Sequence, residues 1–170
     1  MVEVIRIDRL DAELLRRLRS NARAGVAELA AQIGISRNTV LARLQRLERT
    51  EILKGYQPVI DLDAAGIPVQ AFVGLELEQR QLGHVVEELS RIPEVIEITT
   101  QAGREDLLVR VAAVTLQELQ RAVGEMIEVH GVRRSNTTLS VSTPLPYRVQ
   151  PLLDRLTQEA GWGRSTPPPK

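Results

Sequence analysis

The stretch that decides the fold is residues 25–49, GVAELAAQIGISRNTVLARLQRLER. Gly34 interrupts its apolar pattern, and Ser36 follows as a favourable N-cap, because its hydroxyl can accept from the free amides of a first helical turn. The second half then carries apolar residues at the i, i+4 and i+7 positions of one helical face: Val40, Leu44 and Leu47. The stretch therefore predicts two short helices joined by a tight turn, the helix-turn-helix layout.

Polar side chains on the second of these helices are the candidate DNA contacts. An arginine can donate two parallel hydrogen bonds to guanine, and an asparagine can pair with adenine, when they stand on the exposed N-terminal face of a helix in the major groove. Ser36 is expected to cap the helix and lie beside a phosphate, and Arg43 is expected to face away from the apolar stripe. A solvated helix face is the alternative interpretation. The predicted DNA-binding residues are Ser36, Arg37, Asn38, Thr39, Arg43 and Arg46.

The composition restricts the class of protein. Hydrophobic residues make up 43% of the chain, and no apolar run approaches the roughly 18 to 20 residues that span a bilayer. Charges come too early at the N-terminus for a secretory signal. The absence of cysteine excludes disulfides and thiolate chemistry, and two histidines, His84 and His130, are too few for a metal site. We therefore expect a cytoplasmic protein with no membrane contact, cofactor or metal.

The net charge of zero hides an asymmetry along the chain. Residues 1–60 hold 11 basic and 7 acidic side chains, whereas residues 61–142 hold 7 basic and 13 acidic ones. A basic N-terminal third joined to an acidic remainder suits a polyanion-binding module attached to a domain that does not touch nucleic acid. Ordinary variation of surface charge is the alternative explanation.

Upstream and downstream of the opening stretch, the pattern divides the chain into parts. Leucines at helical spacing predict a first helix over 8–21, and residues 52–60 have the character of one or two extended segments. Three leucines near residue 154 predict one or two helical turns, and residues 161–170 are expected to be disordered. The predicted parts are a helix-turn-helix domain at 1–60, a connector at 61–68, a second domain at 69–143 and a partly disordered tail at 144–170.

The second domain alternates strand and helix patterns. Strands are predicted at 69–77, 95–101, 106–114 and 132–143, with helical spacing at 82–89 and 116–127, which gives the order β-α-β-β-α-β of the ferredoxin-like unit. The fold class is therefore α+β. Both helices of this unit cover one face of the sheet, and Phe72 and Leu108 indicate an apolar opposite face. An uncovered apolar face usually marks an interface, so we predict a homodimer through the sheets.

Five fragments, in this order and spacing, resemble one family. They are LDAELLRRLRSNAR (10–23), ELAAQIGISRNTVLARLQRLE (28–48), ILKGYQPVID (52–61), TTQAGREDLLVRV (99–111) and GVRRSNTTLSV (131–141). Together they resemble the leucine-responsive/asparagine-type (Lrp/AsnC) transcription regulators of bacteria and archaea. The resemblance implies a regulator that binds palindromic double-stranded DNA as a dimer or a higher assembly, often an octamer. It also implies a second domain that binds an amino acid or a related small metabolite.

The same resemblance suggests an effector site around the hairpin between the middle strands. There Gly103 and Asp106 would help to hold the charged ends of an amino acid, although a hairpin turn needs such residues for purely local reasons. The sequence GRED lacks the aromatic residue usual in the family, which favours a polar or charged effector. The expected effector-binding residues are Thr100, Gln101, Gly103, Arg104, Asp106, Ser135 and Thr137.

The sequence departs from the family pattern at one further position and leaves two other functional hypotheses open. Glu51 stands where the family commonly has glycine just past the recognition helix, so we expect a different helix exit. A siroheme-decarboxylase-like enzyme has a similar layout, but it would not need the basic helix face. A protein that keeps the architecture without binding DNA is the third hypothesis.

Overall fold

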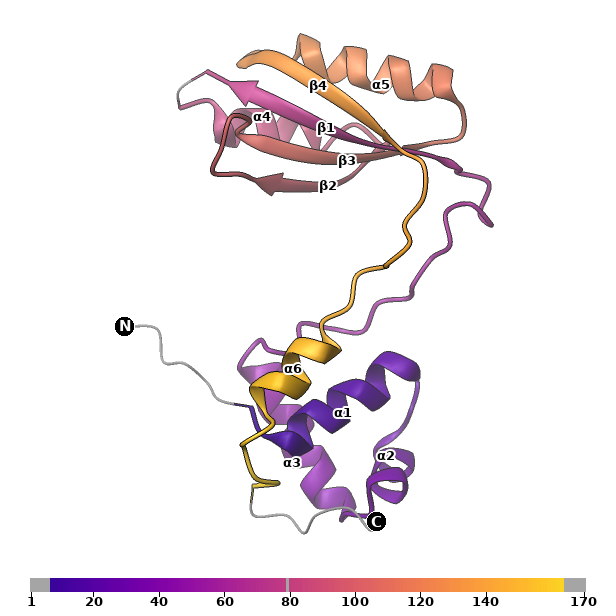
Figure 1. The fold of residues 1–170 in the computed structure, drawn as a ribbon, viewed down its shortest axis with the longest axis vertical. Helices are drawn as coiled ribbons and strands as arrows, with labels where there is room; N and C mark the ends of the chain where they lie inside the picture. Colours follow the sequence, from indigo (N-terminus) through magenta and orange to yellow (C-terminus); the bar gives the residue numbers. More distant parts are fainter. Residues whose placement is uncertain (1–6, 79, 164–170) are drawn as a thin grey trace. The chain divides into compact units, whose positions relative to one another are not determined.

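The computed structural model describes residues 7–78 and 80–163, which form two compact units (Figure 1). Residues 60–145 make up one unit. The other combines the residues before them, up to Val59, with those that follow, from Pro146 onward. The first unit is therefore made of two separate parts of the sequence, and the second unit lies between them.

The first unit is a helical bundle with one apolar core. Its helices are α1 (Arg9–Ser20), α2 (Val26–Ile33), α3 (Arg37–Arg49) and α6 (Gln150–Leu156). The first begins with a capping box, in which Asp8 accepts from the Asp11 amide while Asp11 accepts from the Asp8 amide. The three predicted helices are confirmed, and their shared core consists of Leu10, Leu14, Leu18, Leu29, Ala30, Ile33, Val40 and Leu44.

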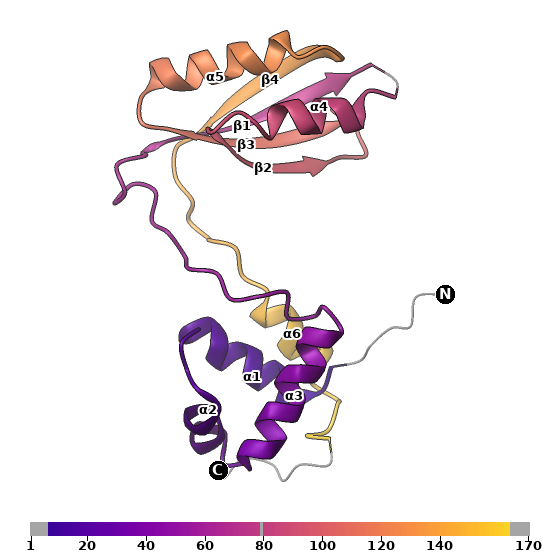
Figure 2. The ribbon, with the colours of Figure 1, turned by 180° about the vertical axis from the view of Figure 1, so that it is seen from behind.

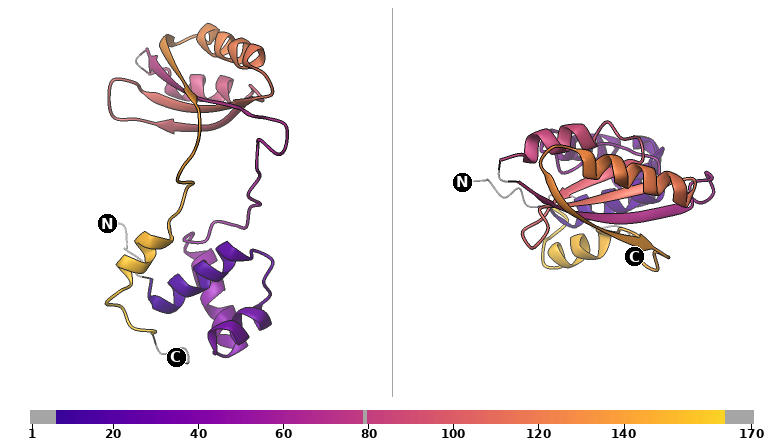
Figure 3. Two further views of the ribbon diagram at one scale, coloured as in Figure 1. Left: turned by 45° about the vertical axis from the view of Figure 1, so that its right-hand side comes forward. Right: turned by 90° about the horizontal axis from the view of Figure 1, so that it is seen from above.

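Part of the C-terminal segment, which was expected to be a partly disordered tail, belongs to the first unit. Its leucines do form a short helix, α6, but this helix packs on α1 of the same unit (Figure 3). Beyond it, Trp162 packs against the leucine core of the bundle. Of the residues expected to be disordered, 161–163 are thus part of the first unit, and 164–170 lie outside the described residues.

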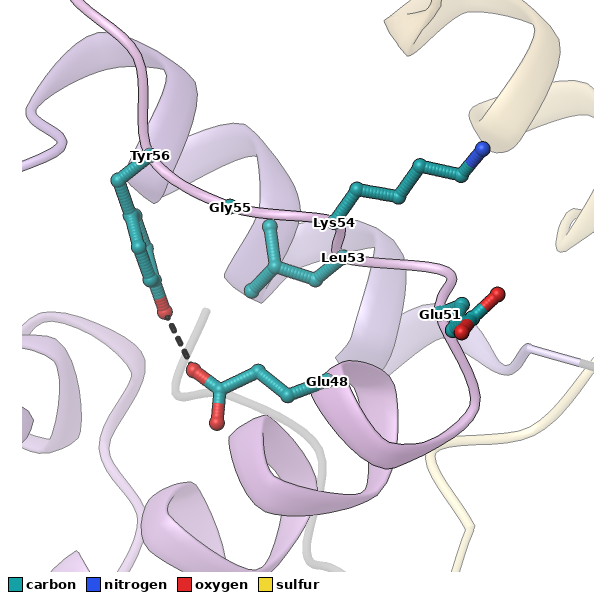
Figure 4. A pocket seen from close by; sticks show the side chains of 6 residues that line it. All are labelled: Glu48, Glu51, Leu53, Lys54, Gly55 and Tyr56. Atoms are coloured by element: carbon teal, nitrogen blue, oxygen red, sulfur yellow. Dashed lines mark hydrogen bonds between the residues drawn. The ribbon is translucent and has the colours of Figure 1, made fainter.

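The exit from α3 also differs from its prediction. Glu51 itself adopts the left-handed conformation, with φ of 55°, and the Leu53 amide donates to the Leu47 carbonyl at 3.0 Å. The expectation of another exit is therefore wrong, because the glutamate takes the backbone geometry of the usual glycine. The following residues fold back beside the helix end, where the Tyr56 hydroxyl donates to the Glu48 carboxylate at 3.1 Å (Figure 4). A pocket of about 510 Å³ lies beside this helix end and is lined by Glu48, Glu51, Leu53, Lys54, Gly55 and Tyr56.

The left-handed conformation of Glu51 leads to a prediction about the stability of the first unit. A non-glycine residue in this conformation costs roughly 1–2 kcal/mol, whereas glycine adopts it freely but loses more chain entropy on folding. We expect Glu51→Gly to stabilise the first unit by about 0.5–1 kcal/mol in urea denaturation followed by Trp162 fluorescence. Glu51→Ala removes the same charge but keeps the strained Cβ, so it should give no comparable gain. Equal gains in both variants would assign the effect to charge instead.

Residues 52–60, where one or two extended segments were expected, are not assigned to a helix or a strand in the structure. A strand needs a neighbour for its amides and carbonyls, and the described part of a single chain supplies none here. Val59 is fully exposed and Ile60 is 65% exposed.

The second unit is the predicted ferredoxin-like fold. Its elements are β1 (Val69–Leu77), α4 (Leu82–Leu89), β2 (Val95–Thr100), β3 (Leu107–Ala113), α5 (Leu116–Glu128) and β4 (Val132–Ser140). The sheet is antiparallel with the order β2-β3-β1-β4, and α4 and α5 cover one face (Figure 2). Buried residues on that face form the core, including Val73, Leu75, Val109, Val85, Leu89, Leu119 and Met126.

The opposite face of the sheet is less apolar than predicted. Phe72, 38% exposed, lies between Arg110 on β3 and Thr138 on β4, and Leu108 pairs with Gly74. Since alternate residues of a strand point to opposite faces, the side chains that share this face are mainly polar. They are Gln70, Glu76, Glu97, Thr99, Arg110, Arg134, Asn136 and Thr138. The open face therefore has an apolar centre, formed by Phe72 and Leu108, that is surrounded by polar side chains, whereas the whole face was expected to be apolar.

Candidate functional site

The turn before α3 has the local geometry that the sequence predicted. Gly34 ends α2 in the left-handed conformation, with φ of 79°. Ser36 then caps α3: its hydroxyl accepts from the Thr39 amide at 3.1 Å and lies 2.8 Å from the Thr39 hydroxyl. The serine therefore starts the helix, and Thr39 is bound to the cap within the turn.

Two arginines of α3 are held by aspartates of α1. Arg43 Nη1 lies 2.5 Å from Asp8 Oδ2 and 3.1 Å from Asp11 Oδ1, and Arg46 Nη2 contacts Asp11 Oδ2. Asp11 is fully buried, and the Arg43 side chain is only 19% exposed. The expectation that Arg43 faces away from the core is wrong: it precedes Leu44 at the edge of the apolar stripe and turns toward α1. We call Asp8, Asp11, Arg43 and Arg46 the ionic cluster.

The ionic cluster changes the acidity of Asp8. Burial alone would raise the pKa of this carboxyl, but the hydrogen bond from the Asp11 amide and the Arg43 guanidinium outweigh it and lower the pKa below 3.8. The pKa of Arg43 is raised in turn: burial alone would lower it, but the two carboxylates outweigh that effect. A carboxyl with a depressed pKa contributes stability that is present above its unfolded value and is lost as the pH falls through the folded value.

We therefore expect the first unit to lose stability as the pH falls below about 4. The variant Asp8→Asn keeps a good N-cap residue but cannot titrate, so its acid sensitivity should be smaller. Urea midpoints from Trp162 fluorescence at a series of acidic pH values measure this difference. Identical pH dependence in the wild type and Asp8→Asn would contradict the role of this carboxyl.

The solvent-exposed face of α3 is a different set of residues from the ionic cluster. The helix buries Val40, Leu44 and Leu47, so the side chains away from these three point to solvent. Of these residues, sequence reasoning named Arg37 and Asn38 as DNA contacts but not the other five, which the helical spacing from Val40 would have revealed. The exposed residues of α3 are Arg37, Asn38, Leu41, Ala42, Gln45, Glu48 and Arg49.

A pocket of about 410 Å³ lies near the hairpin of the second unit. Of the expected effector residues, only Arg104 and Ser135 line it. Thr100 pairs with Leu107 and Thr137 with Val73, so both stand on the helix-covered face of the sheet. Gln101 and Gly103 belong to the hairpin turn. The pocket is instead completed by Gly74, Glu76, Glu105, Arg134 and Asn136, which sequence reasoning missed.

Charged side chains dominate this pocket. Arg104 Nε lies 3.3 Å and Arg134 Nη1 lies 3.8 Å from Glu76 Oε1. The carboxylate of Glu105 lies over Gly74, in the space that a Cβ at that position would occupy. Among the described residues, Glu105 has no ion-pair partner. The pocket thus presents two guanidinium groups and a half-buried free carboxylate.

Asp106 has a structural contact in the same region. Its Oδ2 accepts from the Leu77 amide at 2.7 Å, at the point where the pairing of β1 with β4 is irregular. Its own amide donates to the Leu75 carbonyl at 2.8 Å. Asp106 therefore fixes the end of β1 to the hairpin, which is the local role expected of such an aspartate.

The two histidines of the chain lie near each other in the second unit. The ring centroids of His84 and His130 are 6.3 Å apart. Within the part of the chain that the structure describes, no group of three or more histidine, aspartate or glutamate side chains is placed to hold a metal ion.

Comparison with known proteins identifies the family. A model of the AsnC-type helix-turn-helix domain matches residues 7–48, and a model of the Lrp/AsnC ligand binding domain matches residues 70–150. An uncharacterised HTH-type transcriptional regulator of Pyrococcus abyssi is 31% identical over 139 residues, which cover 81% of this chain and 88% of that relative. The chain belongs to the Lrp/AsnC family.

Solved structures share the fold of this Lrp/AsnC protein. AsnC of E. coli superimposes with a TM-score of 0.79 at 24% identity, over 86% of this chain and all of that one. A transcriptional regulator of Neisseria meningitidis, solved as a complex with L-Met, gives 0.75 at 20% identity, over 83% of this chain and 94% of that one.

Family membership decides between the classes of function. This Lrp/AsnC protein is a DNA-binding transcriptional regulator with a ligand-binding domain. The relatives carry the names of regulators, which favours this hypothesis over a siroheme-decarboxylase-like enzyme. None of the helices within residues 7–78 and 80–163 has the length and apolar character that crossing a bilayer requires.

Proposed function

We propose that the exposed face of α3 reads operator DNA, while the ionic cluster holds this helix on α1. The observation that carries the proposal is the division of the arginines of α3 between these two tasks. Arg43 and Arg46 are engaged by buried or half-buried carboxylates, whereas Arg37, Asn38 and Arg49 face solvent. Of the predicted DNA-binding residues, we propose that Arg37 and Asn38 contact bases. Ser36 and Thr39, at the helix start, are suited to a phosphate.

The protein acts on DNA as a homodimer. A pair of recognition helices related by a two-fold axis matches two half-sites of a palindrome, about 34 Å apart for successive major grooves. Two features support self-association: the Phe72 and Leu108 centre on the open sheet face, and exposed Val59 and Ile60 in a segment that has no strand partner. We also propose that the dimers assemble into octamers, as the family resemblance implies, and that the protein acts in the cytoplasm, where the chromosomal DNA lies.

The effector is an amino acid, and it binds at the charged pocket of the second unit. A free amino acid carries a carboxylate and an ammonium group, which complement the guanidinium groups of Arg104 and Arg134 and the carboxylate of Glu105. The complex of the Neisseria regulator with L-Met supports this ligand class. The absence of an aromatic residue from the Gly103–Asp106 turn favours a polar or charged side chain on the effector.

The test combines DNA selection with an effector screen. Duplexes selected from a random pool by the purified protein should be palindromic, and binding should weaken steeply with salt because phosphates are neutralised. One of the twenty L-amino acids, added singly, should raise the thermal midpoint and change the DNA affinity, and Glu105→Gln should abolish both effects. The DNA half of the proposal fails if no duplex is enriched at moderate salt. The effector half fails if no amino acid changes either quantity.

A further inference from the structure

The segment that follows the second unit is built into the DNA-binding unit. Gln150, only 7% exposed, donates to the Ala12 carbonyl at 3.1 Å and to Asp154 at 2.8 Å. Asp154 in turn forms an ion pair of 2.7 Å with Arg16 of α1. The helix α6 therefore attaches to α1 through a buried amide and a surface charge pair, in addition to side-chain packing.

The attachment continues beyond α6. Arg9, the first residue of α1, donates from its amide to the Gly161 carbonyl and from its Nε to the Thr157 carbonyl, both at 3.3 Å. Thr157 is 2% exposed, and Trp162 packs on the leucine core. We call residues 150–163 the strap, because they run from one part of α1 to another with contacts at each step.

The strap ends against the ionic cluster that holds the recognition helix. Gly163 has φ of 65°, and a Cβ at this position would stand 2.2 Å from Arg43 Nη2 and 2.7 Å from Asp8 Oδ2. A side chain at this position would have to displace these two groups, and the left-handed backbone also favours glycine. The strap thus covers the Asp8–Arg43 ion pair and helps to keep the guanidinium of α3 engaged with α1.

The strap is also a covalent continuation of the second unit. Residues 141–149 join the end of β4 to the start of α6, and Arg134 and Ser135 of β4 line the charged pocket. The second unit is therefore joined to the first by two chain segments, one leading from α3 and one leading to the strap. An effector bound beside β4 would therefore be connected along the chain, through residues 141–149, to the strap on α1 and the ionic cluster.

We infer that the strap is the link through which the effector-binding unit controls the recognition helix. Effector binding changes the hold of the strap on α1, and the ionic cluster converts that change into a different setting of α3. This inference rests on the proposed function, because it requires an effector that alters DNA affinity. Coupling of this kind needs an element with two arrangements that both sites bias, and a segment packed on one unit and tethered to the other can supply it.

Lengthening the link tests the inference in the full chain. A flexible insertion of six glycine and serine residues between Thr143 and Pro144 leaves both units and the strap intact but relaxes the tether. The matched control carries the same insertion between Gln57 and Pro58, in the other link. Each of the twenty L-amino acids is tested singly for its effect on the affinity for the selected duplex.

We expect the effector to change the DNA affinity of the wild type about fivefold or more, the usual size of such coupling, and that of the Thr143 insertion variant less than about twofold. The control with the insertion between Gln57 and Pro58 should keep most of the wild-type factor. Trp162 is the only tryptophan, so its emission reports on the strap directly. It should shift on addition of effector in the wild type and not in the Thr143 variant.

Two negative results have separate meanings. If the wild type responds and the Thr143 variant responds by the same factor, the strap is not the link and the inference is wrong, while the proposed function stands. If no amino acid changes the DNA affinity of the wild type, the effector half of the proposed function falls and the inference falls with it.

Discussion

Replacing Asp11 with alanine is expected to destabilise the DNA-binding unit by about 2–3 kcal/mol, because two guanidinium groups then lose their shared buried counter-charge. Asp11 is fully buried, and both of its oxygens accept from arginines of α3. Removing one partner of a fully buried ion pair costs roughly 3–5 kcal/mol. The side chains of Arg43 and Arg46 are 19% and 30% exposed and can turn partly to water, so we expect a smaller loss.

The measurement is urea denaturation followed by Trp162 fluorescence, which reports on the first unit alone. Arg16→Ala is the matched control, since it removes two ion pairs, with Glu13 and Asp154, from an arginine that is 47% exposed. Surface pairs contribute little, so this control should lose less than about 1 kcal/mol. Equal losses in the two variants would show that the ionic cluster is no more important than a surface pair.

Replacing Asn38 with alanine is expected to weaken binding to the selected duplex about 10- to 100-fold, the usual contribution of one bidentate contact to a base. Asn38 is exposed in the first turn of α3 and has no hydrogen bond to the rest of the described chain. Its loss should therefore leave the stability of the unit unchanged within about 0.5 kcal/mol. Fluorescence anisotropy with labelled duplex measures the affinity.

Two further variants separate base contact from general effects. Gln32→Ala changes an exposed amide on α2, where its only described partner is Glu28, and should bind DNA like the wild type. Arg43→Ala should reduce DNA binding and stability together, because this arginine holds α3 on α1. Wild-type affinity in Asn38→Ala would remove this residue from the recognition face.

The elements of both units were predictable because their signals are local and periodic. Apolar spacing and the Ser36 cap define α3, and alternation defines the strands of the sheet. The sequence also contained the evidence against Arg43 as an outward residue: it precedes Leu44 and lies one turn from Leu47, at the border of the buried stripe. The prediction of Arg43 and Arg46 as DNA contacts did not take account of Asp8 and Asp11, the N-cap and a first-turn residue of α1, as partners for these arginines.

Other features depended on contacts that local patterns do not contain. The charged pocket gathers Glu76 from β1, Glu105 from the hairpin and Arg134 from β4, so it required the strand register. The docking of α6 joins residues almost 140 positions apart in sequence, such as Gln150 and Ala12. The polar character of the open sheet face emerged only when the register showed which residues share it. Glutamate rarely adopts the left-handed conformation, so the conformation of Glu51 could not be predicted from its residue type. The path of the chain beyond α3 requires this conformation and outweighs the preference of one residue.

The return of the chain to its first unit sets the order of events during synthesis. A ribosome makes α1, α2 and α3 first, but α6 and Trp162 of the same bundle come only after the whole of residues 60–145. The ferredoxin-like unit is contiguous in sequence, so its sheet needs no residue beyond 145. The DNA-binding bundle, in contrast, cannot reach its final form until the whole ligand-binding domain has been synthesised.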